Sequence, residues 1–359
     1  MPTPLAIAFP RDGDILNRCD GAESPDALIV TVRGTAAPGS SVHVNGKKAA
    51  RDGKIFTCDV ALTERRNAIH AEADGHAAAI EVFWNRGSRK RYRFSVDDNI
   101  LFLKDLGTNP AAYRSLFDHW YLGFWQSMHM KYGTKIHINV YYQTDEFDLT
   151  QMPDQWRDEW RANADWLHLS FHALQDKPDR PYRNARYAQM AHDHDLVCGH
   201  IRRFAGNENV SRTTTVHWAE CPKEAALALR DRGIDQLIGL FEVQGYEGPC
   251  TTGYYLSREQ CAHCDSRGAW FDRETGLTFI RCTSVVNALE VEAIESYLNQ
   301  RTATPQTAEM VELLIHEQYF RKELTLYQPT VLEKVETALR WVAQRGYEPV
   351  FWSDGFLGV

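Results

Sequence analysis

Two adjacent carboxylates, Asp97 and Asp98, follow a strand-like run in the stretch RYRFSVDDN, which begins at Arg91. The run alternates and is rich in aromatic and β-branched residues, whereas Asp-Asp-Asn is typical of a turn. The two carboxylates are therefore predicted at the end of a strand, where open α/β sheets and barrels place their chemistry. A carboxylate in that position can hold a metal ion or take a proton from water.

Three histidines occupy the same position on other predicted strands: His172, His217 and His316. Because different strands converge only at their ends, this set predicts a metal site or an acid/base site in a barrel. Taken singly, each residue also fits a plainer role. A lone histidine on an apolar strand is typically a hydrogen-bonded core residue, and an aspartate commonly caps the helix that follows it.

Strand-like and helix-like segments alternate from Arg91 onward for about 270 residues, which is the size and order of a (β/α) barrel. The expected strands cover residues 91–97, 134–143, 166–174, 212–218, 235–242, 277–286, 311–317 and 347–353. The expected helices include residues 112–132, 185–204, 223–232 and 329–345. The sequence thus predicts an α/β catalytic domain over residues 89–359.

The first 88 residues have a different pattern, with short alternating runs separated by Pro-Gly, Asn-Gly and Asp-Gly turns. This pattern predicts a small all-β sandwich. Residues 26–84 resemble bacterial immunoglobulin-like modules in the hairpin Val42 to Gly46, the turn Asp52 to Gly53, and the later positions Phe56, Val60, Leu62, Asn67 and Ile69. The resemblance implies a fold and no particular function.

Residues 91–359 resemble the polysaccharide deacetylase family in three short motifs, one of which, at His172, matches only in part. Ser95-Val96-Asp97-Asp98-Asn99 is similar to that family's Thr/Ser-Phe/Tyr-Asp-Asp-Gly, and Leu314-Ile315-His316 fits its Leu-x-His. The resemblance implies a distorted (β/α) barrel in which Asp97 is the general base, Asp98 a metal ligand and His316 the general acid.

Two departures from the family pattern leave parts of the site open. The family's His-Ser/Thr-x-x-His motif is represented by His172-Ala-Leu-Gln-Asp176, so only the first histidine ligand matches, and the Arg-x-Pro-Tyr motif that orients the base is absent. His217, at a neighbouring strand end, is the preferred third ligand, and Asp176 is the alternative. Asp98, His172 and His217 would together hold a divalent cation, for which zinc is the expected identity. Such a cation would lower the pKa of a bound water to about 7.

The expected substrate is an N- or O-acetylated sugar. Aromatic residues follow several predicted strand ends, and aromatic faces stack on pyranose rings while carboxylates and carboxamides hold hydroxyl groups. The predicted substrate-binding residues are Tyr142, Trp218, Glu220, Gln318, Tyr319 and Trp352.

Two other classes of protein remain open. A glycoside hydrolase or polysaccharide lyase on a similar barrel would use carboxylates for proton transfer and would be indifferent to chelators. A glycan-binding protein would keep the barrel without turnover. The carboxylates available to the first alternative include Asp145, Glu220, Glu242, Glu317 and Asp354.

The composition is that of a globular protein, with 43% hydrophobic and 25% charged residues. A net charge of -8 with scattered basic residues argues against a nucleic-acid partner. Neither a run of 18 apolar residues nor a signal-like start occurs, so a membrane partner is not expected. The sequence as given is expected to be cytoplasmic, or secreted or periplasmic if a leader has been removed.

Eight cysteines in 359 residues do not indicate a disulfide framework. Cys261 and Cys264 in CAHC have zinc-ligand or redox spacing, but no second pair is evident, so we interpret them as reduced thiols in a loop. The surrounding segment, Gln244 to Thr275, is rich in glycine and polar residues. We hypothesise that it forms a lid or a specificity loop.

Overall fold

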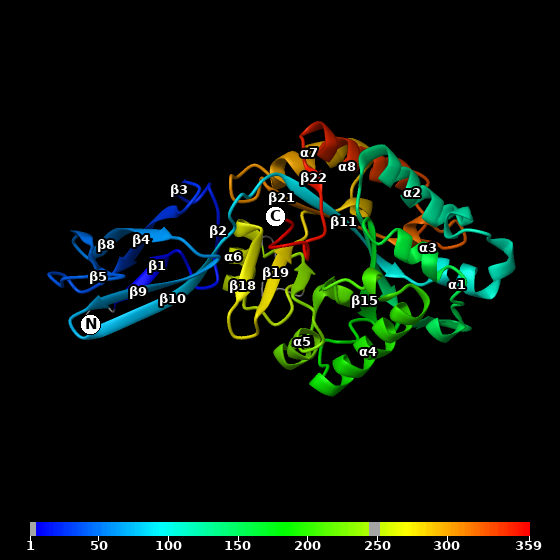
Figure 1. Cartoon of the computed structure of the whole chain (residues 1–359), viewed down its shortest axis with the longest axis horizontal. Coiled ribbons are helices and arrows are strands. Elements are labelled where there is room, and N and C mark those ends of the chain that lie inside the picture. The colour runs from blue at the N-terminus through cyan, green and yellow to red at the C-terminus, as the bar shows by residue number, and fades with distance from the viewer. Residues whose placement is uncertain (1–4, 244–251) are drawn as a thin grey trace. The chain divides into compact units, whose positions relative to one another are not determined.

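The computed structural model describes residues 5–243 and 252–359, which divide into two compact units. The first unit comprises residues 1–88, 269–276 and 359, and the second comprises residues 89–268 and 277–358. Figure 1 shows strands alone in the blue N-terminal part and a mixture of helices and strands in the later part. The mixed α/β character expected from the sequence is therefore confirmed.

The first unit is built from two β-sheets. One sheet has the order β1-β4-β8-β7 with β3 beside β4, and the other has the order β2-β10-β9-β5-β6. Alternate residues of β4 and β8 are buried, and apolar side chains of both sheets, including Val30 and Ile69, form one core. The immunoglobulin-like resemblance stays a prediction. The strands are β1 Ala6–Phe9, β2 Ile15–Leu16, β3 Ala22–Glu23, β4 Leu28–Thr35, β5 His43–Val44, β6 Lys47–Lys48, β7 Ala50–Asp52, β8 Ile55–Leu62, β9 Arg66–Ala73, β10 His76–Trp84 and β18 Ala269–Asp272.

The second unit is organised around parallel strands. One sheet has the order β15-β12-β11-β21-β20 with β22 also beside β11, and a second contains β16-β17-β19. The two sheets meet at both ends. Next to β15, the backbone N–H of Ser211 donates to the carbonyl oxygen of Leu169, and β20 of the first sheet follows β19 of the second after two residues. The strands are β11 Arg91–Asn99, β12 Ile136–Tyr141, β13 Gln143–Thr144, β14 Phe147–Asp148, β15 Leu167–Ala173, β16 Thr213–Thr214, β17 Gln236–Gly239, β19 Leu277–Arg281, β20 Ser284–Val285, β21 Met310–His316 and β22 Glu348–Pro349.

Helices pack against the apolar side of these strands. Trp125 of α2 contacts Phe94 of β11 with ring centroids 5.3 Å apart, and His194 of α4 contacts Phe171 of β15 at 5.7 Å. In Figure 1 the green helices α4 and α5 lie close to each other. The helices are α1 Leu101–Thr108, α2 Trp120–Tyr132, α3 Arg157–Ala162, α4 Tyr187–Phe204, α5 Lys223–Arg230, α6 Arg258–Arg267, α7 Val291–Arg301 and α8 Val331–Gln344.

Polar residues alternate with the apolar ones along the central strands, and their side chains form one buried network. Arg93 of β11 makes a salt bridge of 2.7 Å to Glu312 of β21, and both side chains are fully buried. Arg93 also contacts His137 of β12, whose Nε2 lies 2.8 Å from Ser170 Oγ of β15. Because successive side chains of a strand point to opposite faces, every second residue of each strand faces this network.

Several predicted elements differ from the structure. The strands expected at 212–218 and 347–353 contain only Thr213–Thr214 and Glu348–Pro349. In the proposed lid, residues 244–251 lie outside the described residues, and Arg258–Arg267 forms helix α6 with a capping box of Ser257 and Gln260. Cys261 and Cys264 are buried on this helix, so the interpretation of CAHC as a loop was wrong. The Ser-x-x-Gln signature was a usable helix signal.

Two residues separate helix α1 from the paired aspartates, yet neither aspartate caps it. Its N-cap residue, Ile100, makes no side-chain capping bond. Instead, the backbone N–H groups of Ile100, Leu101 and Phe102 donate to the Glu317 carboxylate over 2.7–2.9 Å. Glu317 is fully buried and also accepts from Arg321 at 2.7 Å. Because Glu317, which follows the distant strand β21, caps helix α1, the carboxylates of Asp97 and Asp98 remain free of that role.

Replacing Glu317 by alanine is expected to destabilise the second unit by about 3–5 kcal/mol. It leaves three helix N–H groups without their acceptor, and it removes the buried carboxylate partner of Arg321, whose guanidinium keeps only the half-exposed Asp105 and the exposed Glu323. Urea unfolding followed by tryptophan fluorescence measures this change. Glu323→Ala is the matched control, since Glu323 contacts the same Arg321 at 3.6 Å but is 64% exposed. The control is expected to cost at most about 1 kcal/mol. Equal losses in the two variants would contradict the capping role.

Candidate active site

A β-bulge in β11 brings both aspartates into one cavity. The pairing of β11 with β12 is regular from Phe94 to Val96 and shifts between Val96 and Asn99. Asp98 within this bulge has a φ of 61°, a left-handed conformation that is uncommon outside glycine. In a regular strand, adjacent side chains would point to opposite faces. The bulge instead lets Asp97 and Asp98 line the same cavity.

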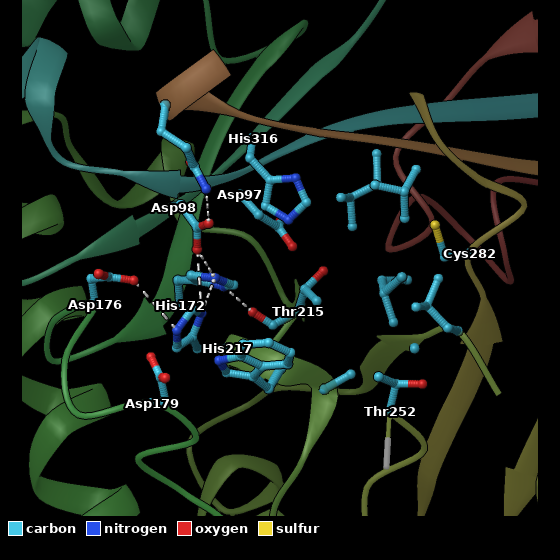
Figure 2. A pocket seen from close by; sticks show the side chains of 18 of the residues that line it. Asp97, Asp98, His172, Asp176, Asp179, Thr215, His217, Thr252, Cys282 and His316 are labelled. Carbon is cyan, nitrogen blue, oxygen red and sulfur yellow. Dashed lines mark hydrogen bonds and ion pairs between the residues drawn. The ribbon is translucent and has the colours of Figure 1, made fainter. Parts of the chain in front are cut away.

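Asp98, His172 and His217 come together around one point. Asp98 Oδ1 lies 3.0 Å from His172 Nε2 and 3.2 Å from His217 Nδ1, and the two histidine nitrogens are 3.3 Å apart. His172 lies on β15, while His217 lies in the short helical turn after β16. Figure 2 shows these three side chains converging. Asp176, the alternative ligand, is 60% exposed, and its Oδ1 lies 3.8 Å from His217 Nε2.

The three donor atoms fit a divalent cation. Zinc binds nitrogen and oxygen at about 2.0–2.2 Å in a tetrahedron, which places neighbouring ligand atoms about 3.3 Å apart. The separations of 3.0, 3.2 and 3.3 Å are close to that value. His172 Nδ1 donates to the carbonyl oxygen of Thr215, which directs Nε2 toward Asp98. One carboxylate and two imidazoles leave a coordination position open, as catalytic zinc sites do.

The charges of the site are coupled. Burial acts to raise the pKa of Asp98, but hydrogen bonds from His172 and His217 outweigh it and hold that pKa well below its usual value. Burial acts to lower the pKa of His172, but Asp97 and Asp98 outweigh it and raise that pKa. Asp98 is thus an anionic ligand at neutral pH, and a cation that binds here competes with protons for His172.

Asp97 and His316 lie side by side because β11 and β21 pair in register, with Asp97 opposite His316. Burial raises the pKa of Asp97, although His172, His316 and Asn139 act against this, so the carboxylate is a better proton acceptor than an exposed one. Asn139 Nδ2 donates to Asp97 Oδ1 at 2.5 Å, and His316 Nδ1 lies 2.9 Å from Asn287 Oδ1. Asn139 therefore orients the carboxylate, and no Arg-x-Pro-Tyr motif is needed for that.

Tyr141 contacts the three donor residues, a role that the sequence analysis did not assign to it. Its hydroxyl donates to Asp98 Oδ1 and lies 3.0 Å from His217 Nδ1, and the side chain is buried. Burial raises the pKa of Tyr141 well above its usual value, so the group stays a neutral phenol. The usable signal was the alternation of His137, Asn139 and Tyr141 along one face of a predicted strand.

Replacing Tyr141 by phenylalanine is expected to weaken metal binding about 10- to 100-fold, because the hydroxyl orients two of the three donor residues. Metal titration of the stripped protein with a competing chelator measures the change. Tyr142→Phe is the control, since Tyr142 follows the strand and its ring lies beside His200 instead. Unchanged metal affinity in Tyr141→Phe would contradict the role of the hydroxyl.

The predicted substrate-binding residues divide into two groups. Trp218, Gln318 and Tyr319 line the cavity of about 370 Å³ that contains the three donor residues. Gln318 Nε2 also donates to Asp98 Oδ2 at 2.7 Å, and Trp218 is 42% exposed. Glu220 pairs with Arg180 and Arg183, the Tyr142 ring lies beside His200, and fully buried Trp352 donates to Glu312. These last three therefore have structural contacts of their own.

A second cavity of about 930 Å³, called the polar cavity because most of its lining residues are polar, meets the first at Asp98. Asp98, Asp176, Lys177 and Gln318 line both cavities. The polar cavity is also lined by carboxamides and carboxylates, among them Gln143, Gln151, Gln175, Asp145 and Asp148. Asp98 thus lies between two cavities, and a substrate can reach across it.

Neither a protein family nor a curated protein matches this sequence. Among solved structures, 4-α-glucanotransferase from Thermococcus litoralis has 10% identity and a TM-score of 0.46 over 72% of this chain, which spans 38% of that protein's length. A CE4 esterase from Streptococcus mutans has 11% identity and a TM-score of 0.38, covering 72% of this chain and 84% of the esterase. A candidate polysaccharide deacetylase from Mycobacterium smegmatis has 14% identity and a TM-score of 0.39, covering 76% of this chain and 97% of its own.

All three TM-scores lie below 0.5. The function proposed for the chain is therefore based on the geometry of the site. Within the described residues, no helix has the length and apolar character needed to cross a membrane.

Proposed function

We propose that the chain is a metal-dependent hydrolase that removes an acyl group from a carbohydrate, on a distorted (β/α) barrel of the polysaccharide deacetylase type. One observation carries the proposal. Three donor atoms of Asp98, His172 and His217, mutually 3.0–3.3 Å apart, lie in the same cavity as the in-register pair Asp97 and His316. A ligand set beside a separate base and acid is what metal-assisted acyl hydrolysis requires.

Asp98, His172 and His217 would hold the divalent cation, with zinc as the best fit to this donor set. Such a cation supplies a Lewis acid that polarises the acyl carbonyl and makes a nearby water more acidic. Asp97 takes the proton from that water as its oxygen adds to the carbonyl carbon. Asn139 holds the Asp97 carboxylate in place through its amide N–H.

His316 acts on the leaving group. If its Nδ1–H donates to Asn287 Oδ1, the other ring nitrogen is free to carry a second proton toward the cavity. That proton passes to the leaving amine or alcohol as the carbon–nitrogen or carbon–oxygen bond breaks. The net reaction consumes one water and yields a carboxylic acid and the free amine or alcohol.

A carbohydrate suits the surroundings of these residues. Trp218 offers an exposed aromatic face beside His217, with the Arg180 guanidinium 4.9 Å from its ring centroid. Carboxamides and carboxylates of the polar cavity, such as Gln143 and Asp145, match hydroxyl groups. Aromatic faces with polar groups beside them are typical of sugar-binding clefts.

The test is acyl release from acetylated glycans and from p-nitrophenyl acetate by metal-loaded protein and by protein stripped with a chelator. Turnover that disappears on stripping and returns with zinc, cobalt or nickel supports the proposal. Cleavage of glycosidic bonds that a chelator leaves unchanged would replace it with a carboxylate-based glycosidase or lyase. Glycan binding without turnover in either form would indicate a binding protein.

A further inference from the structure

The cavity at the donor residues continues into an apolar chamber. Its wall away from the three ligands is formed by Ile238, Gly239, Leu240, Cys282, Val285 and Leu314, from β17, the segment that follows it, β20, β21 and the β19–β20 link. In Figure 2, Cys282 and Thr252 are on one side of Asp97, His316 and Thr215, and the three donor residues are on the other. The base and the acid therefore stand at the mouth of the chamber.

The chamber wall lacks charge. Burial raises the pKa of the Cys282 thiol well above its usual value, so the thiol is neutral. Ile238 and Leu314 contribute aliphatic carbon, and Gly239 has no room for a side chain, because an added Cβ would come within 2.7 Å of the Phe241 ring. A sugar hydroxyl enclosed among these six residues would lose hydrogen bonds to water, and among the described residues Thr252 is the one hydroxyl-bearing residue on this side of the cavity that could replace any of them. An aliphatic chain, in contrast, would lose none.

The cavity as a whole, including the side lined by the donor residues, is larger than an acetyl group needs. An acetyl group ends in one methyl, which is similar in size to a water molecule with its share of about 30 Å³ of liquid volume. The cavity measures about 370 Å³. Each further methylene buried against such a wall strengthens binding about fourfold. An acyl chain of several carbons would therefore use space that acetyl leaves empty.

The polar cavity on the other side of Asp98 fits the rest of such a substrate. Asp145, Glu146 and Asp148 line it, and Lys177 is shared with the chamber side. Because carboxylates outnumber basic groups in this cavity, it favours a substrate part that is neutral or cationic over one that is acidic. The scissile bond would lie at Asp98, with the acyl chain in the apolar chamber and the polar alcohol or amine in the polar cavity.

We propose, resting on the function above, that the substrate is an ester or amide that joins a neutral or cationic polyhydroxylated molecule to an acyl chain several methylenes longer than acetyl. The test compares p-nitrophenyl acetate, butyrate, hexanoate and octanoate, which share one leaving group, on metal-loaded protein. We expect kcat/KM to rise at least tenfold from acetate to hexanoate. The highest value with acetate would overturn the chain-length proposal and leave the hydrolase intact.

Absence of hydrolysis with every ester would count against the proposed function, and the chamber is then tested by binding. Calorimetric titration of the full chain with hexanoate and with acetate measures this directly. Hexanoate binding at least tenfold more tightly supports an acyl chamber. Equal affinities, or binding of neither, overturn it.

Substitutions at Val285 test the location of the chain. Val285→Phe fills the chamber and is expected to lower the ratio of hexanoate to acetate kcat/KM at least tenfold, while Val285→Ala enlarges it and moves the optimum to longer chains. Leu332→Phe adds similar bulk at an exposed position of α8 and is expected to leave the ratio unchanged. If Val285→Phe does not fold, the alanine variant decides alone. An unchanged optimum in Val285→Ala overturns the assignment.

Discussion

Purified protein is expected to hold about one divalent cation per chain, and alanine at Asp98, His172 or His217 is expected to remove it. Each of these residues supplies one of three donor atoms that are 3.0–3.3 Å apart. Loss of one donor leaves two, so affinity is expected to fall more than the roughly 10- to 100-fold typical of residues outside the ligand set. Elemental analysis after incubation with zinc, cobalt and nickel measures the content.

Asp176→Asn is the matched control for the ligand variants. Asp176 lines the same cavity and was the alternative third ligand in the sequence analysis, but its carboxylate is 60% exposed and 3.8 Å from His217. The variant is expected to keep its metal. Metal loss in Asp176→Asn with retention in His217→Ala would reverse the assignment of the third ligand. Absence of metal from the wild type under all conditions would remove the proposed mechanism.

Asp97→Asn is expected to lower kcat about 10²- to 10⁴-fold while metal content stays near the wild-type value. The substitution keeps the shape of the side chain and an oxygen that can accept from Asn139, but it removes the basic lone pair. His316→Gln is expected to reduce kcat over a similar range, and less so for p-nitrophenyl esters, whose leaving group needs little protonation. Paired measurements of kcat and metal content separate the base and the acid from the ligands.

Asp165→Asn serves as the control for the catalytic variants, because Asp165 is an exposed carboxylate two residues before the start of β15. Activity equal to the wild type is expected. If Asp97→Asn lost its metal together with its activity, Asp97 would be a ligand and the base would have to be another group. If Asp97→Asn kept full activity, Asp97 would not be the general base.

The sequence predicted the parts of the site that depend on local pattern. Strands β11, β12, β15 and β21 were expected close to their observed positions, since each is a run of alternating residues long enough to register as a strand. Asp97, Asp98, His172 and His316 were identified because they end such runs. β16, with two residues, was too short to define its own end, so His217 was located only approximately.

Residues whose role depends on a neighbouring strand were missed. Asn139 and Tyr141 looked like interior positions of one strand, and only the pairing of β12 with β11 brings them to Asp97 and Asp98. Glu317 looked like a candidate catalytic carboxylate, but packing of its strand end against α1 makes it the cap of that helix. The partner of Asn139 is about 40 residues away in the chain, and the partners of Glu317 are more than 200 residues away.

By itself, the sequence determined which residues end the main strands and which chemical types they offer, because side-chain alternation and turn propensity act over a few neighbouring residues. Only the tertiary structure showed that a β-bulge directs the side chains of Asp97 and Asp98 into the same cavity. It placed His217 beside Asp98 and His172 as the third donor residue. It also decided that an apolar chamber opens beyond Asp97. These features depend on strand register and packing between distant segments, which local propensity does not encode.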